Sequence, residues 1–236
     1  MLNEIQLSKI LFLDIETVPA FESYDDLDNN FRKLWDQKAM RISKEESETP
    51  DILYERAGIY AEFGKIICIS AGLMKGNEFR IKSFYGDDEK SLLNDFANML
   101  SHFKTSRDHL LCAHNGKEFD FPYISRRMLI NDIRIPDILD IAGKKPWEVA
   151  HLDTMELWKF GDFKSYTSLD LLATVFNIPT PKDDIDGSQV AHVYWQEKNL
   201  DRIVTYCQKD VLTIAQLMHK YKGLPLIKAE DVVIVV

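Results

Sequence analysis

The sequence predicts an α/β protein in which helices cover a mixed β-sheet, with residues 1–236 forming a single domain. Apolar runs bounded by polar residues predict buried strands, a short Gly-containing turn joins two of these runs, and segments with helical spacing separate the others. With 45% of its residues hydrophobic, the chain can build a packed core, which excludes a disordered protein. The length suits one large domain or two small ones, and the order of elements favours one mixed sheet.

The first predicted strand, Lys9–Glu16, is followed by a segment of different character. The strand is an apolar run that Pro19 ends. Residues 21–62 then contain eleven acidic and six basic side chains. Apolar residues within 31–35 predict a helix there, and a second helix follows a polar stretch. We interpret residues 21–62 as an acidic helical insertion beside the core.

The next two strands form a predicted hairpin. Lys65–Met74 and Glu78–Tyr85 are apolar runs joined by Lys75-Gly76-Asn77, and so short a Gly-containing joint indicates antiparallel pairing. The remaining expectations are a helix over 92–100, a strand at His109–Ala113, a helix over about 121–129, a strand or short extended segment over 151–158, and helices over 167–176, 188–198 and 200–221. The last five residues, Val232–Val236, are either an edge strand or a contact for a partner.

Charge and composition narrow the class of protein. The net charge of −9 argues against a non-specific polyanion binder, which normally carries a basic stripe. Apolar runs fall short of the roughly 18 residues that span a bilayer, so no membrane contact is expected. The N-terminus lacks the pattern of a secretory signal. Three scattered cysteines form no CxxC pair, which favours reduced thiols and a cytoplasmic protein.

Three segments carry side chains suited to chemistry, and each also has an ordinary structural interpretation. Asp14 and Glu16 share one face of the first strand, although a strand that simply runs out to solvent would look the same. Asp120 follows the strand that ends at Ala113, where it could equally serve as a helix N-cap. Tyr206 and Asp210 lie one helical turn apart, which also fits a surface pair.

Together the segments supply four carboxylates and a phenol, a combination more specific than its parts. Adjacent anions repel unless a proton or a cation is shared. Carboxylates are hard oxygen ligands suited to Mg²⁺ or Mn²⁺. Two such ions can stabilise both the attacking and the leaving oxygen of a phosphodiester.

In this arrangement the sequence resembles the DEDD 3′–5′ exonucleases. The matching motifs are Asp14-x-Glu16, Asn115-x-x-x-Phe119-Asp120 and Tyr206-x-x-x-Asp210, in that order. The resemblance covers about residues 9–222 and is strongest to the exonuclease domain of family-B DNA polymerases and to stand-alone relatives, for which Pro181–Ser188 is also typical. It implies an RNase H-like fold with a mixed five-stranded sheet and flanking helices. Thr205 stands where other members carry histidine, so the resemblance is to the tyrosine subtype (DEDDy).

The resemblance also implies roles for individual residues. Asp14 would bridge two divalent ions, Mg²⁺ or Mn²⁺; Glu16 and Asp210 would complete the ion site that holds the attacking water. Asp120 would hold the second ion near the leaving 3′ oxygen. Tyr206 would orient the water by hydrogen bonding, because a phenol with a pKa of about 10 is a poor base at neutral pH.

The function that follows is metal-dependent hydrolysis of phosphodiester bonds from the 3′ end of single-stranded DNA or RNA. Asn115 and Phe119 would contact the terminal nucleotide. Two alternatives stay open: a catalytically weak module that binds nucleic-acid ends, and a hydrolase of short oligonucleotides. Six basic residues could contact phosphates or could be ordinary solvated side chains: Arg126, Arg127, Lys144, Lys145, Lys159 and Lys164.

Overall fold

The computed structural model describes residues 2–103, 108–162, 165–179 and 185–235. The strands and α-helices of these residues follow in the order β1 (Ile10–Pro19), α1 (Asn29–Ile42), α2 (Pro50–Tyr54), β2 (Gly64–Lys75), β3 (Glu78–Tyr85), α3 (Glu89–Phe103), β4 (Leu110–Ala113), α4 (Asp120–Ile130), β5 (Leu152–Asp153), α5 (Thr154–Lys159), α6 (Leu169–Val175), α7 (Val190–Trp195), α8 (Leu200–Tyr221) and β6 (Val232–Val235). Residues 180–184 lie outside the described part, so only the end of the Pro181–Ser188 segment can be placed.

The sheet is mixed, as expected, but it has six strands in the order β5-β4-β1-β2-β3-β6. β1, β2 and β3 form an antiparallel meander, with the predicted turn at Gly76 in the left-handed region at φ 63°. β4 runs parallel to β1, and β5 runs parallel to β4. The expectation of five strands was wrong because the Val-rich C-terminal segment pairs in parallel with β3 as β6.

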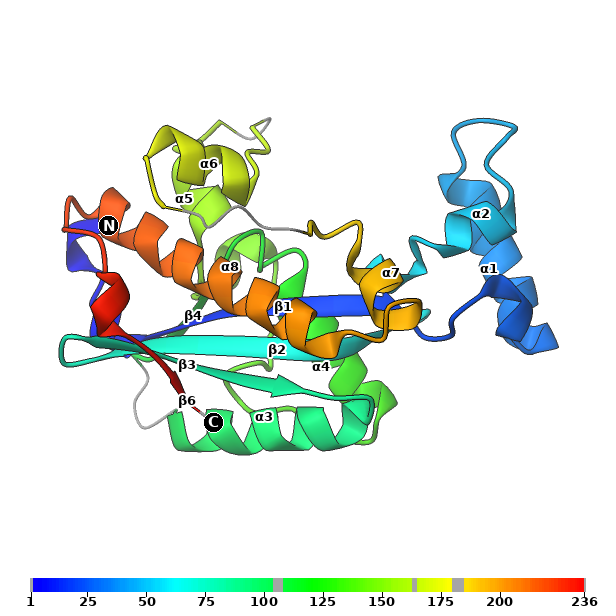
Figure 1. Ribbon diagram of the computed structural model, residues 1–236, viewed down its shortest axis with the longest axis horizontal. Helices are drawn as coiled ribbons and strands as arrows, with labels where there is room; N and C mark the ends of the chain where they lie inside the picture. Colours follow the sequence, from blue (N-terminus) through cyan, green and yellow to red (C-terminus); the bar gives the residue numbers. More distant parts are fainter. Residues whose placement is uncertain (1, 104–107, 163–164, 180–184, 236) are drawn as a thin grey trace.

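Helices cover both faces of the sheet, and the alternation of side chains along β1 explains how (Figure 1). α8 lies along one face and α3 along the other. Ile10 and Phe12 pack in one cluster with residues of α8, including Val211 and Ile214. Leu11, Leu13 and Ile15 pack instead with residues of α3 and α4. Because successive side chains of a strand point to opposite faces, Asp14 and Glu16 fall on the α8 face.

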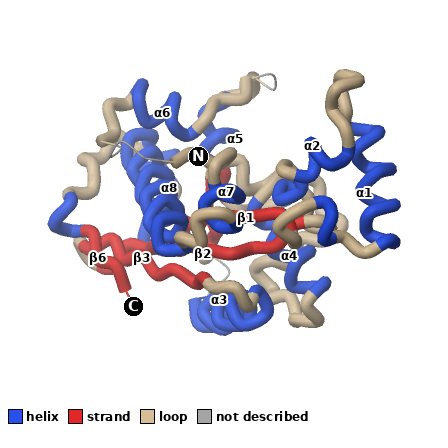
Figure 2. The backbone as a smooth tube through the Cα atoms, turned by 45° about the vertical axis from the view of Figure 1, so that its right-hand side comes forward, coloured by secondary structure: helices blue, strands red, loops and turns tan. Residues whose placement is uncertain are grey.

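The acidic segment 21–62 forms a helical arm at one end of the molecule, where α1 and α2 lie away from the sheet (Figures 1 and 2). The arm has a small core of its own around Trp35, which is fully buried. The Trp35 ring meets Tyr54 and Phe63 edge to face at centroid distances of 5.4 and 5.1 Å. Its indole N–H donates to the Pro50 carbonyl at 2.7 Å.

Segment 151–158 differs from its expected strand or extended segment. β5 is only two residues long and leads directly into α5. Asp153 ends the strand and caps the helix, since its carboxylate accepts hydrogen bonds from the N–H groups of Met155 and Glu156. The described helices include none that is long and apolar enough to cross a bilayer.

Candidate active site

Asp14 and Glu16 lie at the centre of the sheet, on the face that α8 covers. Asp14 is half-buried and Glu16 is 6% exposed. They stand opposite Ser70 and Cys68 of β2, and the register of the two strands shifts directly after Glu16. Such an irregularity bends the strand and changes the direction of its side chains, so the carboxylate pair lies directly before the point where the register shifts.

Asp120 reaches the same place from α4. It is the first residue of the helix and is buried, while Phe119 occupies the N-cap position. The alternative interpretation of Asp120 as the helix N-cap is therefore wrong. Burial raises the pKa of its carboxyl to about 8; Asp153 and Asp210 act in the same direction, and the N–H groups of Asp120 and Ile15 oppose the shift.

α8 supplies Tyr206 and Asp210 from a single helical turn, as the spacing predicted. The Tyr206 hydroxyl hydrogen-bonds the Asp210 carboxylate, and burial together with the negative charge of Asp210, Glu16 and Asp14 raises the pKa of this phenol. Without a bound cation, a phenol in this setting keeps its proton at neutral pH and acts as a hydrogen-bonding group.

The four carboxylates of Asp14, Glu16, Asp120 and Asp210, here called the carboxylate cluster, interact with one another. Burial raises the pKa of Asp14, and the charges of Glu16, Asp210 and Asp120 raise it further. Burial likewise raises the pKa of Glu16, again with contributions from Asp210 and Asp120. Three distant segments thus place four carboxyl groups in one poorly solvated region, where ionising all of them costs free energy unless cations neutralise the charge.

Cys207 is a member of this site that the motifs did not predict. Its thiol donates to the carbonyl oxygen and to Oδ2 of Asp14, both at 3.5 Å. Ligand atoms of Asp14, Glu16 and Cys207 all lie within 4.8 Å of one another. The sequence held one signal, because Cys207 lies three residues before Asp210 and shares its helix face.

Asp153 is the second residue that the sequence reasoning missed. Besides capping α5, its carboxylate accepts hydrogen bonds from the N–H groups of Asn115 and Lys117, at 3.0 and 3.1 Å. It is 3% exposed and thereby fixes the turn that leads to Asp120. The spacing from Asp153 to Glu156 fits a helix N-cap signature, which could have indicated this position.

The turn from His114 to Phe119 is tightly held. Both ring nitrogens of His114 are engaged, Nδ1 with the Thr154 hydroxyl and Nε2 with the Thr167 carbonyl, each at 2.9 Å. Asn115 has a left-handed backbone at φ 62°, and its carbonyl accepts the N–H of Phe119 at 3.0 Å. The Phe119 ring is half-buried against Tyr123, with centroids 5.3 Å apart.

Arg127, one of the six basic residues considered for phosphate contacts, is buried and unsuited to that role. Its guanidinium donates to Glu89 and to the Ala61 carbonyl. Lys164 lies outside the described residues.

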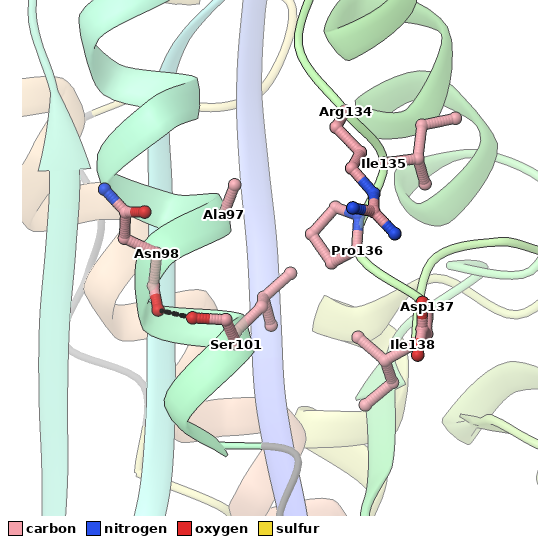
Figure 3. Close-up of a pocket in the computed structure, with 9 residues that line it drawn as sticks. Ala97, Asn98, Ser101, Arg134, Ile135, Pro136, Asp137 and Ile138 are labelled. Carbon is pink, nitrogen blue, oxygen red and sulfur yellow. Dashed lines mark hydrogen bonds between the residues drawn. The ribbon is translucent and has the colours of Figure 1, made fainter.

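A cavity of about 380 Å³ lies apart from the carboxylate cluster. It is formed by α3 and by the loop after α4, with Arg134 and Asp137 on the loop side (Figure 3). None of its nine lining residues belongs to the three motifs. The cavity therefore does not extend the cluster.

Comparison with known proteins agrees with this architecture. The family B DNA polymerase from the hyperthermophilic archaeon Pyrobaculum calidifontis has a similar structure, with a TM-score of 0.51 and 15% sequence identity. The match covers 87% of this chain and 24% of the polymerase chain, so this protein spans about a quarter of that enzyme. At this identity the likeness concerns the fold, which supports an RNase H-like arrangement. No curated protein matches the sequence.

A sequence family matches residues 59–223 and is described as a predicted 3′–5′ exonuclease related to the exonuclease domain of PolB. The matched range includes Asp120, Tyr206 and Asp210, whereas Asp14 and Glu16 precede it. The match covers more than half of the chain. Its residues Asp120, Tyr206 and Asp210 lie at the same site as Asp14 and Glu16. The chain therefore belongs to this family of predicted 3′–5′ exonucleases.

Proposed function

We propose that the protein is a metal-dependent 3′–5′ exonuclease of the tyrosine subtype, acting on the ends of single-stranded nucleic acid with two divalent ions. One observation carries the proposal. Carboxylates from β1, α4 and α8 meet in a buried cluster in which the pKa values of Asp14, Glu16 and Asp120 are all raised. A fold has no structural use for such repulsion, whereas divalent cations would convert it into binding energy.

The donor set fits Mg²⁺ or Mn²⁺, since these cations prefer carboxylate oxygens. Asp14 would be shared between two ions, with Glu16 and Asp210 completing one site and Asp120 the other. When bound, such ions make a bound water more acidic and stabilise charge on the attacking and leaving oxygens of the phosphodiester.

Two further groups would position the reactants. The Tyr206 hydroxyl, which keeps its proton, would orient the attacking water while it remains linked to Asp210. Cys207 would hold the Asp14 carboxylate in place through its thiol. Asn115 and Phe119, on the turn that Asp153 fixes, would contact the terminal nucleotide.

The overall acidity favours attack at a strand end over binding along a duplex. A chain of net charge −9 gains little from the release of counterions that drives non-specific duplex binding. Single strands can instead be held by stacking on aromatic rings and by contacts at the end itself. DNA and RNA would differ at this site only through contacts to the 2′-hydroxyl.

The test is digestion of 5′-labelled single-stranded and double-stranded DNA and RNA of two to about 20 nucleotides, with Mg²⁺, Mn²⁺ or EDTA. We expect stepwise shortening of single strands from the 3′ end, dependent on the metal and abolished by Asp14→Ala. Asp25→Ala is the matched control, because Asp25 is an exposed aspartate of the helical arm, and it should digest like the wild type.

The other outcomes separate the alternatives. Equal digestion by Asp14→Ala would refute the assignment of the site. Binding of 3′ ends without hydrolysis would indicate a module that only holds nucleic acid. Activity confined to two to five nucleotides would indicate an oligonucleotide hydrolase.

A further inference from the structure

A second cavity, of about 410 Å³, opens beside the turn that carries the second motif. Asn115 and Lys117 line it from the turn, Trp147 and Pro146 from the segment before β5, and Met155 from α5. Its volume is within the range of roughly 300–1,000 Å³ typical of small-molecule sites. Unlike the cavity near α3, it shares residues with a proposed site motif.

An exposed aromatic ring forms one wall of this cavity. Trp147 is 73% exposed, which is unusual for the largest side chain in proteins. Lys145 Nζ lies 5.2 Å from the centroid of the Trp147 ring. Lys159, which lines the cavity itself, lies with its Nζ 4.3 Å from the centroid of the Tyr166 ring. Aromatic rings accompanied by lysines are the surface elements on which bases of single-stranded nucleic acids stack.

The polar groups of the lining are nearly balanced in charge. Lys117 pairs with Glu156, their Nζ and Oε2 atoms 2.6 Å apart, so that pair neutralises itself. Glu118 and Lys159 contribute one charge of each sign, and the carboxylate of Asp153, also in the lining, accepts hydrogen bonds from backbone N–H groups. The interior thus suits an uncharged planar group, and Lys145 and Lys159 suit the phosphates on either side of it.

One residue of the lining has an unused hydrogen-bonding capacity. Asn115 Oδ1 is inaccessible to solvent and has no hydrogen-bond partner among the described residues. A buried acceptor left unpaired is unfavourable, and every nucleobase has an N–H that could satisfy it. Asp153 fixes the backbone of Asn115, so the point from which this side chain extends is set before a ligand arrives.

We infer that this cavity binds a base of the single strand near its 3′ end, stacked on Trp147 and hydrogen-bonded by Asn115. The inference rests on the proposed function, because it assumes that the strand reaches the carboxylate cluster. The cavity and the cluster are linked by a short stretch of chain, since the turn that begins at Asn115 leads to Asp120. Trp147 would then be a binding residue that lowers KM and sets the preference for unpaired strands.

The test measures binding separately from hydrolysis. Oligothymidylate of 12 nucleotides is titrated into the protein in EDTA, and tryptophan fluorescence and the anisotropy of a 5′-label are followed. We expect quenching in the wild type that is lost in Trp147→Phe, because the other three tryptophans are not at this cavity. Trp147→Phe should bind nearly as well as the wild type, since a ring remains.

Removal of the ring should have a larger effect. Trp147→Ala should weaken binding and raise KM by about 10-fold, the loss of one base stack, while kcat changes little. Met40→Ala is the matched control, because Met40 is 79% exposed on α1, and it should bind like the wild type.

Unchanged binding and unchanged KM in Trp147→Ala, with the wild type still digesting strands, would overturn the inference and leave the proposed function standing. Loss of digestion by the wild type, with quenching of Trp147 intact, would overturn the function and leave the binding site. Circular dichroism of each variant establishes that it is folded.

Discussion

Acidic side chains gather in two regions of this protein, and they serve opposite purposes. In the helical arm they lie on the surface and stabilise local structure: Asp28 caps α1 by accepting the N–H groups of Asn30 and Phe31, and local hydrogen bonds lower the pKa of Asp51. In the carboxylate cluster, burial and mutual repulsion raise the pKa values of Asp14, Glu16 and Asp120.

The difference shows that net charge is a poor guide to function here. The arm accounts for five of the nine excess negative charges, yet water and backbone N–H groups compensate its carboxylates. The cluster contains only four carboxylates, but they are placed where solvent screening is weak. Cations are expected to bind in the region where the repulsion between carboxylates is not compensated by water or by N–H groups.

The largest expected difference between the two regions is in activity. Glu16→Gln removes one charge from the cluster and should lower the rate of strand digestion by about 100- to 1,000-fold, the usual loss when a group that stabilises developing charge is removed. Glu46→Gln, on an exposed loop of the arm, should leave the rate unchanged. Single-turnover digestion of a 5′-labelled strand measures the rates of both variants. Equal rates would show that the buried carboxylate of Glu16 contributes no more to the reaction than an exposed one.

The next difference concerns pH and stability without metal. Because the pKa of Asp120 is raised from 3.8 to about 8, the folded protein holds a proton that the unfolded chain releases. The contribution of Asp120 to stability should therefore be fully present below about pH 4 and be lost as the pH rises toward 8, by roughly 1 kcal/mol per pH unit. Urea denaturation in EDTA at several pH values measures the slope.

Two variants sharpen this test. Asp120→Asn should flatten the slope, whereas Asp51→Asn should not, since the pKa of Asp51 is lowered. Adding Mn²⁺ at pH 8 should restore stability to the wild type. A stability that rises from pH 5 to 8 in EDTA would contradict the assigned electrostatics of the cluster.

The smallest difference is between two aspartates that cap helices. Asp28→Ala should cost about 1 kcal/mol, the usual value of an N-cap, without loss of activity. Asp153→Ala should cost more, about 2–4 kcal/mol, because it also leaves the partly buried N–H groups of Asn115 and Lys117 without their acceptor. It should also slow digestion by displacing the turn before Asp120. Thermal unfolding and the digestion assay compare the two, and Asp153→Asn, which keeps one acceptor oxygen, should recover part of both losses.

Local patterns were sufficient for most of the architecture. The hairpin was predictable because Gly76 and its neighbours form a short turn between apolar runs. α8 was predictable from its periodic apolar face. β5 was not, because two strand residues and a helix N-cap share one short segment in which neither pattern has room to repeat. β6 could not be distinguished from a partner contact, since its pairing partner, β3, lies far away in the sequence.

Local relations in the sequence are enough to identify the candidate side chains: two carboxylates two residues apart on a strand, one at the start of a helix, and one a helical turn from a tyrosine. These relations follow from the periods of helix and strand. The packing of distant segments brings β1, α4 and α8 together, adds Cys207 and Asp153 to the site, and keeps the acidic arm apart. Burial and long-range charge interactions depend on contacts between distant segments, and no local pattern encodes them.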